Sequence, residues 1–298
     1  MLSVTATFGA ARPEWAFPVA SPVQPPNTED GKPTSVPGSL VQFTPKEIND
    51  LANAVDWFPD RHAPMPRPVV HGSGAALACA ACHLTSGMGH PESSHLAGLP
   101  AAYLERQLAD FKSGDRKDPA RMTAIGGALS AEDARAASEW FAALEPRRWI
   151  KVIEASQIPN SYGNPGRMRL PLPGGGTEAL GRRIVELPQV ADRAIRRDPN
   201  SGFIAYVPIG SVAQGSRLAS SGGGRTQPCA TCHGPALKGL NGVPGIAGAS
   251  ALYTARQLFG FKSGTRDGAS AAMMKPIAAS LTEDDFINLA AYLASLPP

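Results

Sequence analysis

Two five-residue boxes of the form C-x-x-C-H constrain this chain more than any other feature. They read Cys79-Ala80-Ala81-Cys82-His83 and Cys229-Ala230-Thr231-Cys232-His233, and they contain all four cysteines of the 298 residues. No cysteine is left over for a structural disulfide. In each box the two thiols lie about one helical turn apart, so both can bond to one flat group while the next residue points at its centre.

Covalent attachment of haem uses this spacing, because the two thiols add to the two vinyl groups and the adjacent His becomes the proximal iron ligand. We therefore expect two haem c groups, held by Cys79, Cys82, His83, Cys229, Cys232 and His233. The alternatives are one four-thiolate zinc site and two redox-active dithiols. Neither alternative explains why His follows the second Cys in both boxes.

The boxes belong to an internal repeat. Residues 79–114 align without gaps to 229–264, with 16 of 36 positions identical. Two helices are expected in each copy. The first shows apolar residues at helical spacing over 100–112 and 250–262, and the second follows an N-cap hydroxyl at Ser130 and Thr282 with Asp three residues later.

The second axial position of each iron is assigned from the repeat. In residues 206–298 His233 is the only histidine, so a second imidazole cannot come from there. Met122 and Met274 occupy matching places, each seven residues before a leucine that recurs in the repeat. We therefore expect the pairs His83/Met122 and His233/Met274. Thioether ligation raises the reduction potential and closes the iron to substrates, which predicts outer-sphere electron transfer.

Other side chains compete for these roles. A lone Met is ordinarily core filler, which is how we interpret the methionines without a repeat counterpart, Met65, Met88 and Met168. Met273 aligns with Arg121 and is not the shared ligand. Four histidines of the first half are alternatives at the first iron, and the last is nearest the expected pocket: His62, His71, His90 and His95.

Further polar partners are expected around each haem. Each proximal imidazole should donate its other N–H to a backbone carbonyl, from the loops 93–95 and 243–245. The haem propionates need donors, although an Arg beside an apolar stripe is otherwise an ordinary solvated side chain. The repeated candidates are Tyr103, Arg106, Arg116, Tyr253, Arg256 and Arg266.

With these residues in view, the chain resembles the class I c-type cytochromes, specifically the tandem dihaem kind of bacterial periplasms. The resemblance rests on CAACH with Met122, on CATCHG, and on the segments 244–248, 274–279 and 289–292. It implies an all-α fold of two tandem cytochrome c domains, haem c, His/Met ligation and an electron-carrier function.

The expected division is a Pro-rich extension (1–65), a first domain (66–150), a connector (151–205) and a second domain (206–298). The extension should contain a short helix after Thr44. Residues 57–66 are similar to a box found in longer bacterial dihaem cytochromes. Strand-like pieces are expected in the connector at 151–154, 183–187 and 203–207. Both added segments could wrap haem edges or dock a dehydrogenase, and the sequence leaves the two possibilities open.

The partners are expected to be redox proteins. The net charge of +3 is dispersed, which does not favour nucleic acid, and no stretch is long enough for a transmembrane segment. We expect a periplasmic dehydrogenase as donor and another cytochrome or a terminal oxidase as acceptor, with the chain acting as a shuttle or as a dehydrogenase subunit. Haem attachment implies export to the periplasm, although residues 1–11 lack a complete signal peptide.

Two enzyme functions are the alternatives. A dihaem peroxidase needs one exchangeable axial site, which a Met in both copies argues against. A thiosulfate-oxidising dihaem enzyme that relies on a Cys ligand would need a fifth cysteine.

Overall fold

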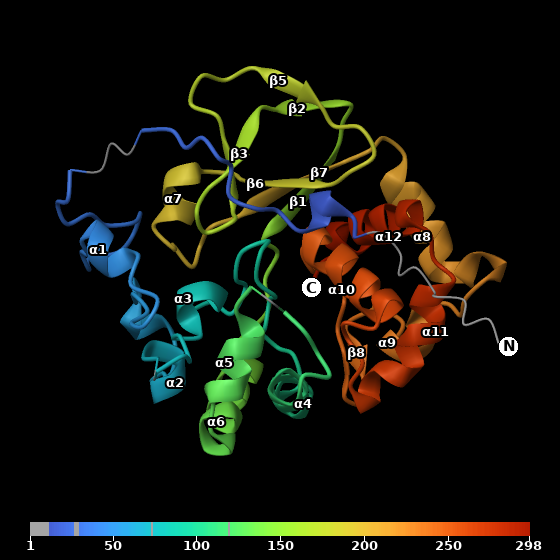
Figure 1. Cartoon of the computed structure of the whole chain (residues 1–298), viewed down its shortest axis with the longest axis horizontal. Coiled ribbons are helices and arrows are strands. Elements are labelled where there is room, and N and C mark those ends of the chain that lie inside the picture. Colours follow the sequence, from blue (N-terminus) through green and yellow to red (C-terminus); the bar gives the residue numbers. More distant parts are fainter. Residues whose placement is uncertain (1–11, 27–29, 73, 119) are drawn as a thin grey trace, which may run out of the picture.

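The computed structural model describes residues 12–26, 30–72, 74–118 and 120–298, and Figure 1 shows it as a mostly helical molecule with small sheets. Residues 1–11, considered above for a signal peptide, lie outside the described residues. We call residues 66–150 the first module and residues 206–298 the second module.

The first module consists of short helices around an apolar cluster. The cluster contains Val69, Leu104, Trp140 and Phe141. As expected, the last helix starts after Ser130, whose hydroxyl accepts from the backbone N–H of Asp133. The helices are α2 (Arg67–Val70), α3 (Ala80–His83), α4 (Ala101–Ser113), α5 (Met122–Ala128) and α6 (Ala131–Ala142).

The second module repeats this arrangement and adds elements. Thr282 forms a full capping box with Asp285 at the start of the last helix. A two-stranded hairpin, which the all-α expectation did not include, follows the attachment box. The elements are α8 (Ser211–Ser221), η3 (Gly222–Gly224), α9 (Ala230–His233), β8 (Gly239–Leu240), β9 (Val243–Pro244), α10 (Ala251–Ser263), η4 (Ala269–Met273), α11 (Met274–Ala279) and α12 (Glu283–Ser295).

Helices α8 and α12 lie in close contact at Gly215. A Cβ placed on this glycine would sit 1.9 Å from the carbonyl oxygen of Asn288. Only a residue without a side chain allows this approach, so Gly215 sets the distance between the two helices.

The connector is a small β-structure packed on the second module. Strand β7 (Phe203–Val207) is central, parallel to β1 (Ile150–Glu154) and antiparallel to β6 (Val185–Pro188). These strands confirm the three expected strand segments. Two two-stranded antiparallel sheets and a helix were not expected: β2 (Gln157–Pro159) with β5 (Thr177–Ala179), β3 (Ser161–Gly163) with β4 (Arg169–Pro171), and α7 (Ala191–Ile195).

Phe203 and Val207 pack in one fully buried cluster with Ile287 and Ala290 of α12. The connector sheet is therefore part of the same core as the second module.

The extension contains the expected helix α1 (Pro45–Ile48), which Thr44 opens with a capping box. Two short 3₁₀ turns, η1 (Glu14–Ala16) and η2 (Pro59–Arg61), complete it. Its own apolar cluster includes Trp57, whose indole N–H donates to the carbonyl of Arg196 in the connector at 2.9 Å. The extension is therefore fastened to the connector.

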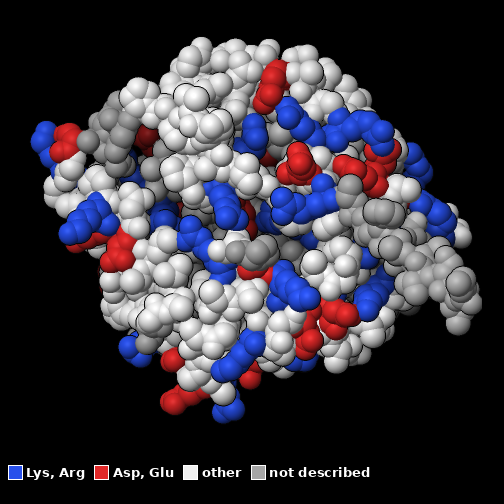
Figure 2. Space-filling model, in the orientation of Figure 1, with Lys and Arg blue, Asp and Glu red and all other residues white. Residues whose placement is uncertain are grey.

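Basic and acidic side chains lie interspersed on the face shown in Figure 2. Among the described residues, no helix is both long and apolar enough to cross a membrane.

Candidate haem-attachment sites

Each C-x-x-C-H box forms a single helical turn. The backbone N–H of His83 donates to the carbonyl of Cys79 at 2.9 Å, and that of His233 to Cys229 at 3.0 Å. The two cysteines and the His of each box therefore lie on one turn, as attachment to one porphyrin requires.

The thiols of both boxes are free. Burial raises the pKa of the Cys79 thiol to about 12, and burial also raises the pKa of the Cys229 thiol. A redox-active dithiol needs a lowered thiol pKa, so these environments argue against dithiol chemistry.

The proximal imidazoles are oriented as expected. His83 Nδ1 lies 2.8 Å from the carbonyl oxygen of Ser94, and His233 Nδ1 lies 2.8 Å from that of Pro244. A carbonyl only accepts, so Nδ1 carries the proton and Nε2 keeps its lone pair for a metal. Burial lowers the pKa of both imidazoles, which favours this neutral form. The two bonds occupy equivalent positions of the repeat.

The two candidate methionines stand at equivalent places. Met122 is the first residue of α5, and Met274 is the first residue of α11. Met274 packs against the same apolar cluster as Cys229 of the attachment turn. Met273, in contrast, is 67% exposed.

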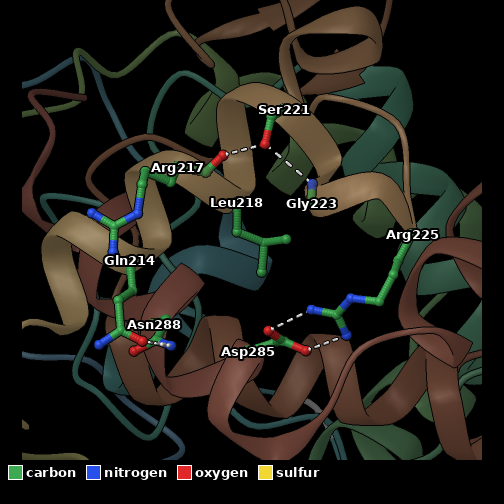
Figure 3. Close-up of a pocket in the computed structure, with 8 residues that line it drawn as sticks. All are labelled: Gln214, Arg217, Leu218, Ser221, Gly223, Arg225, Asp285 and Asn288. Atoms are coloured by element: carbon green, nitrogen blue, oxygen red, sulfur yellow. Dashed lines mark hydrogen bonds and ion pairs between the residues drawn. The ribbon is translucent and has the colours of Figure 1, made fainter.

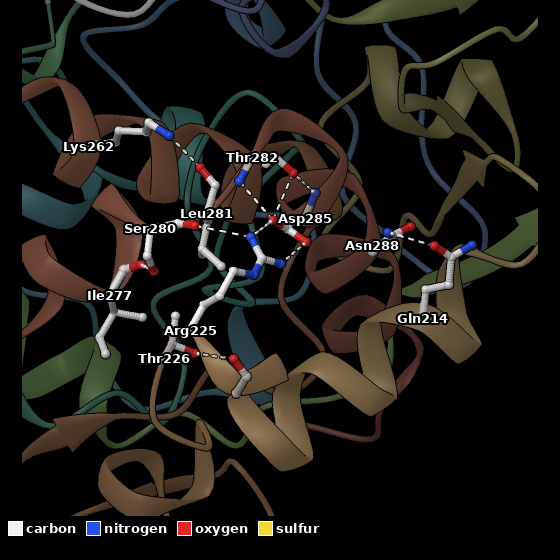
Figure 4. Close-up of polar contacts among 11 residues, drawn as sticks. Gln214, Arg225, Thr226, Lys262, Ile277, Ser280, Leu281, Thr282, Asp285 and Asn288 are labelled. Atoms are coloured by element: carbon white, nitrogen blue, oxygen red, sulfur yellow. Dashed lines mark hydrogen bonds and ion pairs between the residues drawn. The ribbon is translucent and has the colours of Figure 1, made fainter.

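A lysine fixes the segment after each methionine. Lys112 Nζ donates to the carbonyl of Leu129 at 2.9 Å, and Lys262 makes the equivalent bond to Leu281 (Figure 4). Each lysine thus ties the end of the long helix to the residue that precedes the final N-cap.

The second module has an additional clamp on this segment. Arg225 donates to the carbonyl of Ser280 at 3.1 Å and forms a bidentate pair with Asp285 at 2.8 and 2.9 Å (Figures 3 and 4). Burial raises the pKa of Asp285, but the hydrogen bonds from Arg225 and Thr282 outweigh it, so the pKa is lowered overall. The counterpart of Arg225 in the first module is Ala75, which cannot form this clamp.

The pocket drawn in Figure 3 lies beside this clamp, between α8 and α12, and contains none of the expected site residues.

The four competing histidines make contacts within the extension or between segments. His62 bonds Asp56 and His71 bonds Asn53, both within the extension and its junction with the first module. His90 and His95 are buried, each with one ring nitrogen that has no partner among the described residues. The His90 ring contacts Phe203, and the His95 ring faces Tyr253 edge-on with centroids 6.4 Å apart.

Four of the six repeated polar residues meet where α4 and α10 face each other. The Arg116 guanidinium donates to the side-chain oxygen of Gln257 at 2.7 Å and to the Tyr253 hydroxyl at 3.2 Å. Arg266 donates to Gln107 at 2.7 Å and to the Tyr103 hydroxyl at 2.8 Å. Each arginine thus bonds the Gln and the Tyr of the other module, so the two modules are joined with local twofold symmetry.

The glutamines of this network were missed as site residues. The signal was present, because Gln107 and Gln257 are identical at matching positions of the repeat. The other two candidates lie elsewhere: Arg106 reaches the carbonyl of Gly242 at 3.4 Å, while Arg256 bonds the carbonyls of Ala16 and Pro91.

Comparison with known proteins agrees with this geometry. The Cytochrome c family model matches residues 213–297. A protein named "Thiosulfate dehydrogenase electron acceptor" from Stutzerimonas stutzeri (strain A1501) is 30% identical over 225 residues, 74% of this chain and 80% of that protein. This chain belongs to the dihaem class I c-type cytochromes.

Further relatives of this cytochrome are consistent with that family. A second "Thiosulfate dehydrogenase electron acceptor", from Thiomonas intermedia (strain K12), is 29% identical over the same shares of the two chains. Cytochrome c4 of Stutzerimonas stutzeri is 25% identical over 76% of this chain and 87% of that protein. The solved thiosulfate dehydrogenase (TsdBA) of Marichromatium purpuratum matches with a TM-score of 0.50 at 26% identity, covering 74% of this chain and 36% of that chain.

The cytochrome thus carries two covalently attached haem c groups and transfers electrons, and it is not itself an enzyme. The residues fit the cofactor in both modules, since each offers two free thiols on one turn and an imidazole with an available Nε2. When bound, each haem supplies an iron that alternates between the ferric and ferrous states. The zinc and dithiol alternatives are excluded by the family.

Proposed function

We propose that this cytochrome works in the periplasm, taking electrons from a dehydrogenase and passing them to another cytochrome or a terminal oxidase. Residues 66–150 and 206–298 are the two haem domains in this proposal, and residues 1–65 and 151–205 are the added extension and connector. Each iron has a His/Met pair, His83 with Met122 and His233 with Met274.

The observation that carries the proposal is the repeated pair of imidazole–carbonyl bonds. His83 and His233 are fixed identically, and a methionine opens an equivalent helix in each module. Two filled axial positions at both irons leave outer-sphere electron transfer as the chemistry. Thioether sulfur also favours the reduced iron, which suits an electron acceptor.

We further propose that the network between α4 and α10 receives the propionates. Among the described residues, the hydrogen-bond acceptors of Arg116 and Arg266 are only side-chain amide and phenol oxygens. Two guanidiniums so placed attract carboxylates, and Tyr103 and Tyr253 can donate to the same groups. Arg106 and Arg256 already bond backbone carbonyls, so the proposal rests on the other four.

The donor to test first is a thiosulfate dehydrogenase, because the relatives at 29% and 30% identity are named as its electron acceptors. The oxidised cytochrome is mixed with a purified thiosulfate dehydrogenase and thiosulfate, and haem reduction is followed by stopped-flow absorbance. We expect reduction of both haems only when enzyme and thiosulfate are both present. No reduction, in a sample that dithionite reduces fully, would overturn this choice of donor.

A further inference from the structure

The loops after the two attachment turns differ sharply in exposure, although they occupy equivalent positions. Met88 is 1% exposed, whereas its counterpart Lys238 is exposed. His90 is 8% exposed, whereas its counterpart Leu240 is 46% exposed. The repeat therefore presents one covered and one open attachment face.

The extension and the connector cover the first face. The Arg197 guanidinium, from the connector, donates to the carbonyl of Ala81 inside the attachment turn and to that of Ile48 in the extension. The backbone N–H of Ala78, directly before the attachment turn, donates to the carbonyl of Leu51 in the extension at 3.0 Å. Figure 1 shows α3 between α2 and α7. A partner protein cannot approach the first attachment turn from this side.

The second face remains open. Thr231 of the attachment turn is exposed, whereas its counterpart Ala81 is 1% exposed. In residues 234–240, which follow the turn and end in strand β8, Lys238 and Leu240 are also exposed.

Lys238 is the one Lys, Arg, Asp or Glu in residues 229–240, which span the attachment turn and the exposed residues after it. Residues 199–266 contain no Asp or Glu, and they contain six basic residues. Three of these are exposed, Arg217, Arg225 and Lys238, and of the three Arg225 is paired with Asp285. Residues 79–114 of the first module, which align with 229–264, contain in contrast Glu92, Glu105 and Asp110.

We propose, building on the electron-transfer function above, that redox partners dock on the open face formed by Thr231, Lys238 and Leu240, and that the partner presents an acidic surface. The apolar Leu240 supplies a contact that excludes water, while Lys238 steers an acidic protein toward the second attachment turn. The first attachment face takes no partner because it is already occupied by this chain's own segments.

The probe for the docking face is hexacyanochromate(III), a redox-inert paramagnetic trianion that stands in for an acidic partner. It is titrated into the ¹⁵N-labelled, fully reduced holoprotein, and amide line broadening is mapped. We expect broadening over residues 231–240 and none over residues 81–90, with loss of the effect at high salt. Broadening centred on another face would overturn the proposal.

The kinetic counterpart uses one-electron oxidation of the reduced holoprotein by hexacyanoferrate(III), which is an anion, and by tris(phenanthroline)cobalt(III), which is a cation. Lys238→Glu should slow the anionic reagent about threefold to tenfold at low ionic strength and speed the cationic one. Lys151→Glu is the matched control, because Lys151 is exposed on the connector strand β1. Equal effects of the two variants would contradict a specific face.

The two proposals fail in distinguishable ways. If thiosulfate dehydrogenase does not reduce the protein while hexacyanochromate still broadens residues 231–240, the donor is wrong and the docking face stands. If the enzyme reduces the protein while broadening lies elsewhere, the docking face is wrong and the donor stands.

Discussion

Arg116 and Arg266 face each other across the two modules as antiparallel β-bridge partners, and each guanidinium reaches a glutamine of the opposite module. Their backbone neighbours follow the same symmetry, since Lys117 donates to Thr265 at 2.8 Å and Asp267 donates to Asp115 at 2.7 Å. A repeat of one module has thus produced an interface in which equivalent residues meet. Such an interface places the proposed propionate donors of both haems in one network.

Removing either arginine should loosen this interface. Arg116→Gln and Arg266→Gln each remove three hydrogen bonds from a guanidinium, which should cost about 1–3 kcal/mol of unfolding free energy. Because Gln107 and Gln257 each accept from both guanidiniums, their oxygens keep one donor in either single variant and lose both in the double variant, which should therefore lose clearly more than the sum of the single losses. Guanidinium chloride titrations of all four proteins measure this coupling. Strict additivity would show that the two side chains act independently.

The Arg225–Asp285 clamp should give the second module a distinct acid dependence. The pKa of Asp285 is lower in the folded protein than in the unfolded chain, where it is near 4. The ionised carboxylate therefore stabilises the folded protein at pH values above the unfolded pKa. This stabilisation is lost as the pH falls through the folded-state pKa. Arg225→Gln should therefore destabilise the protein at neutral pH and destabilise it less in acid.

The matched control is Arg217→Gln, which alters an exposed arginine of the same pocket. Thermal unfolding at pH 7 and pH 3.5 measures both variants. A deficit for Arg225→Gln that is the same at the two pH values would contradict the role of the ionised Asp285.

Gly215 should tolerate no side chain. Gly215→Ala brings a Cβ against the backbone of Asn288 and should cost about 1–3 kcal/mol through forced separation of α8 and α12. Gly127→Ala is the control, because nothing lies within 4 Å of the added carbon and Ala is the better helix former. Calorimetry should show a lower Tm for the first variant only. Equal Tm values would mean that the two helices adjust without strain.

The features that could be predicted from the sequence depend on residues close together in the chain or on positions that recur in the repeat. The N-caps Ser130 and Thr282 follow from hydroxyl and carboxylate spacing, and the carbonyl partners of His83 and His233 follow from matching loops. The connector strands, including Phe203–Val207, were visible as short β-branched and aromatic runs.

Contacts between distant segments could not be predicted. Glu186 of β6 accepts from the Ser250 hydroxyl and the Ala251 N–H, and so caps α10 from 64 and 65 residues away. Arg197 reaches Ala81 across 116 residues and thereby closes one of two faces that look alike in the repeat. Neither contact has a local signature, because its partner is chosen by the packing of the whole chain.

The measurement that tests the account most directly is an optical spectrum of the oxidised and reduced protein, with haem quantified per chain, for the wild type and for Met122→Ala and Met274→Ala. We expect two covalent haems in all three proteins. The weak far-red sulfur-to-iron band should fall by about half in each variant, with the altered haem's potential lowered on the order of 100 mV. A wild type without that band, or variants that retain it in full, would contradict His/Met ligation at the two irons.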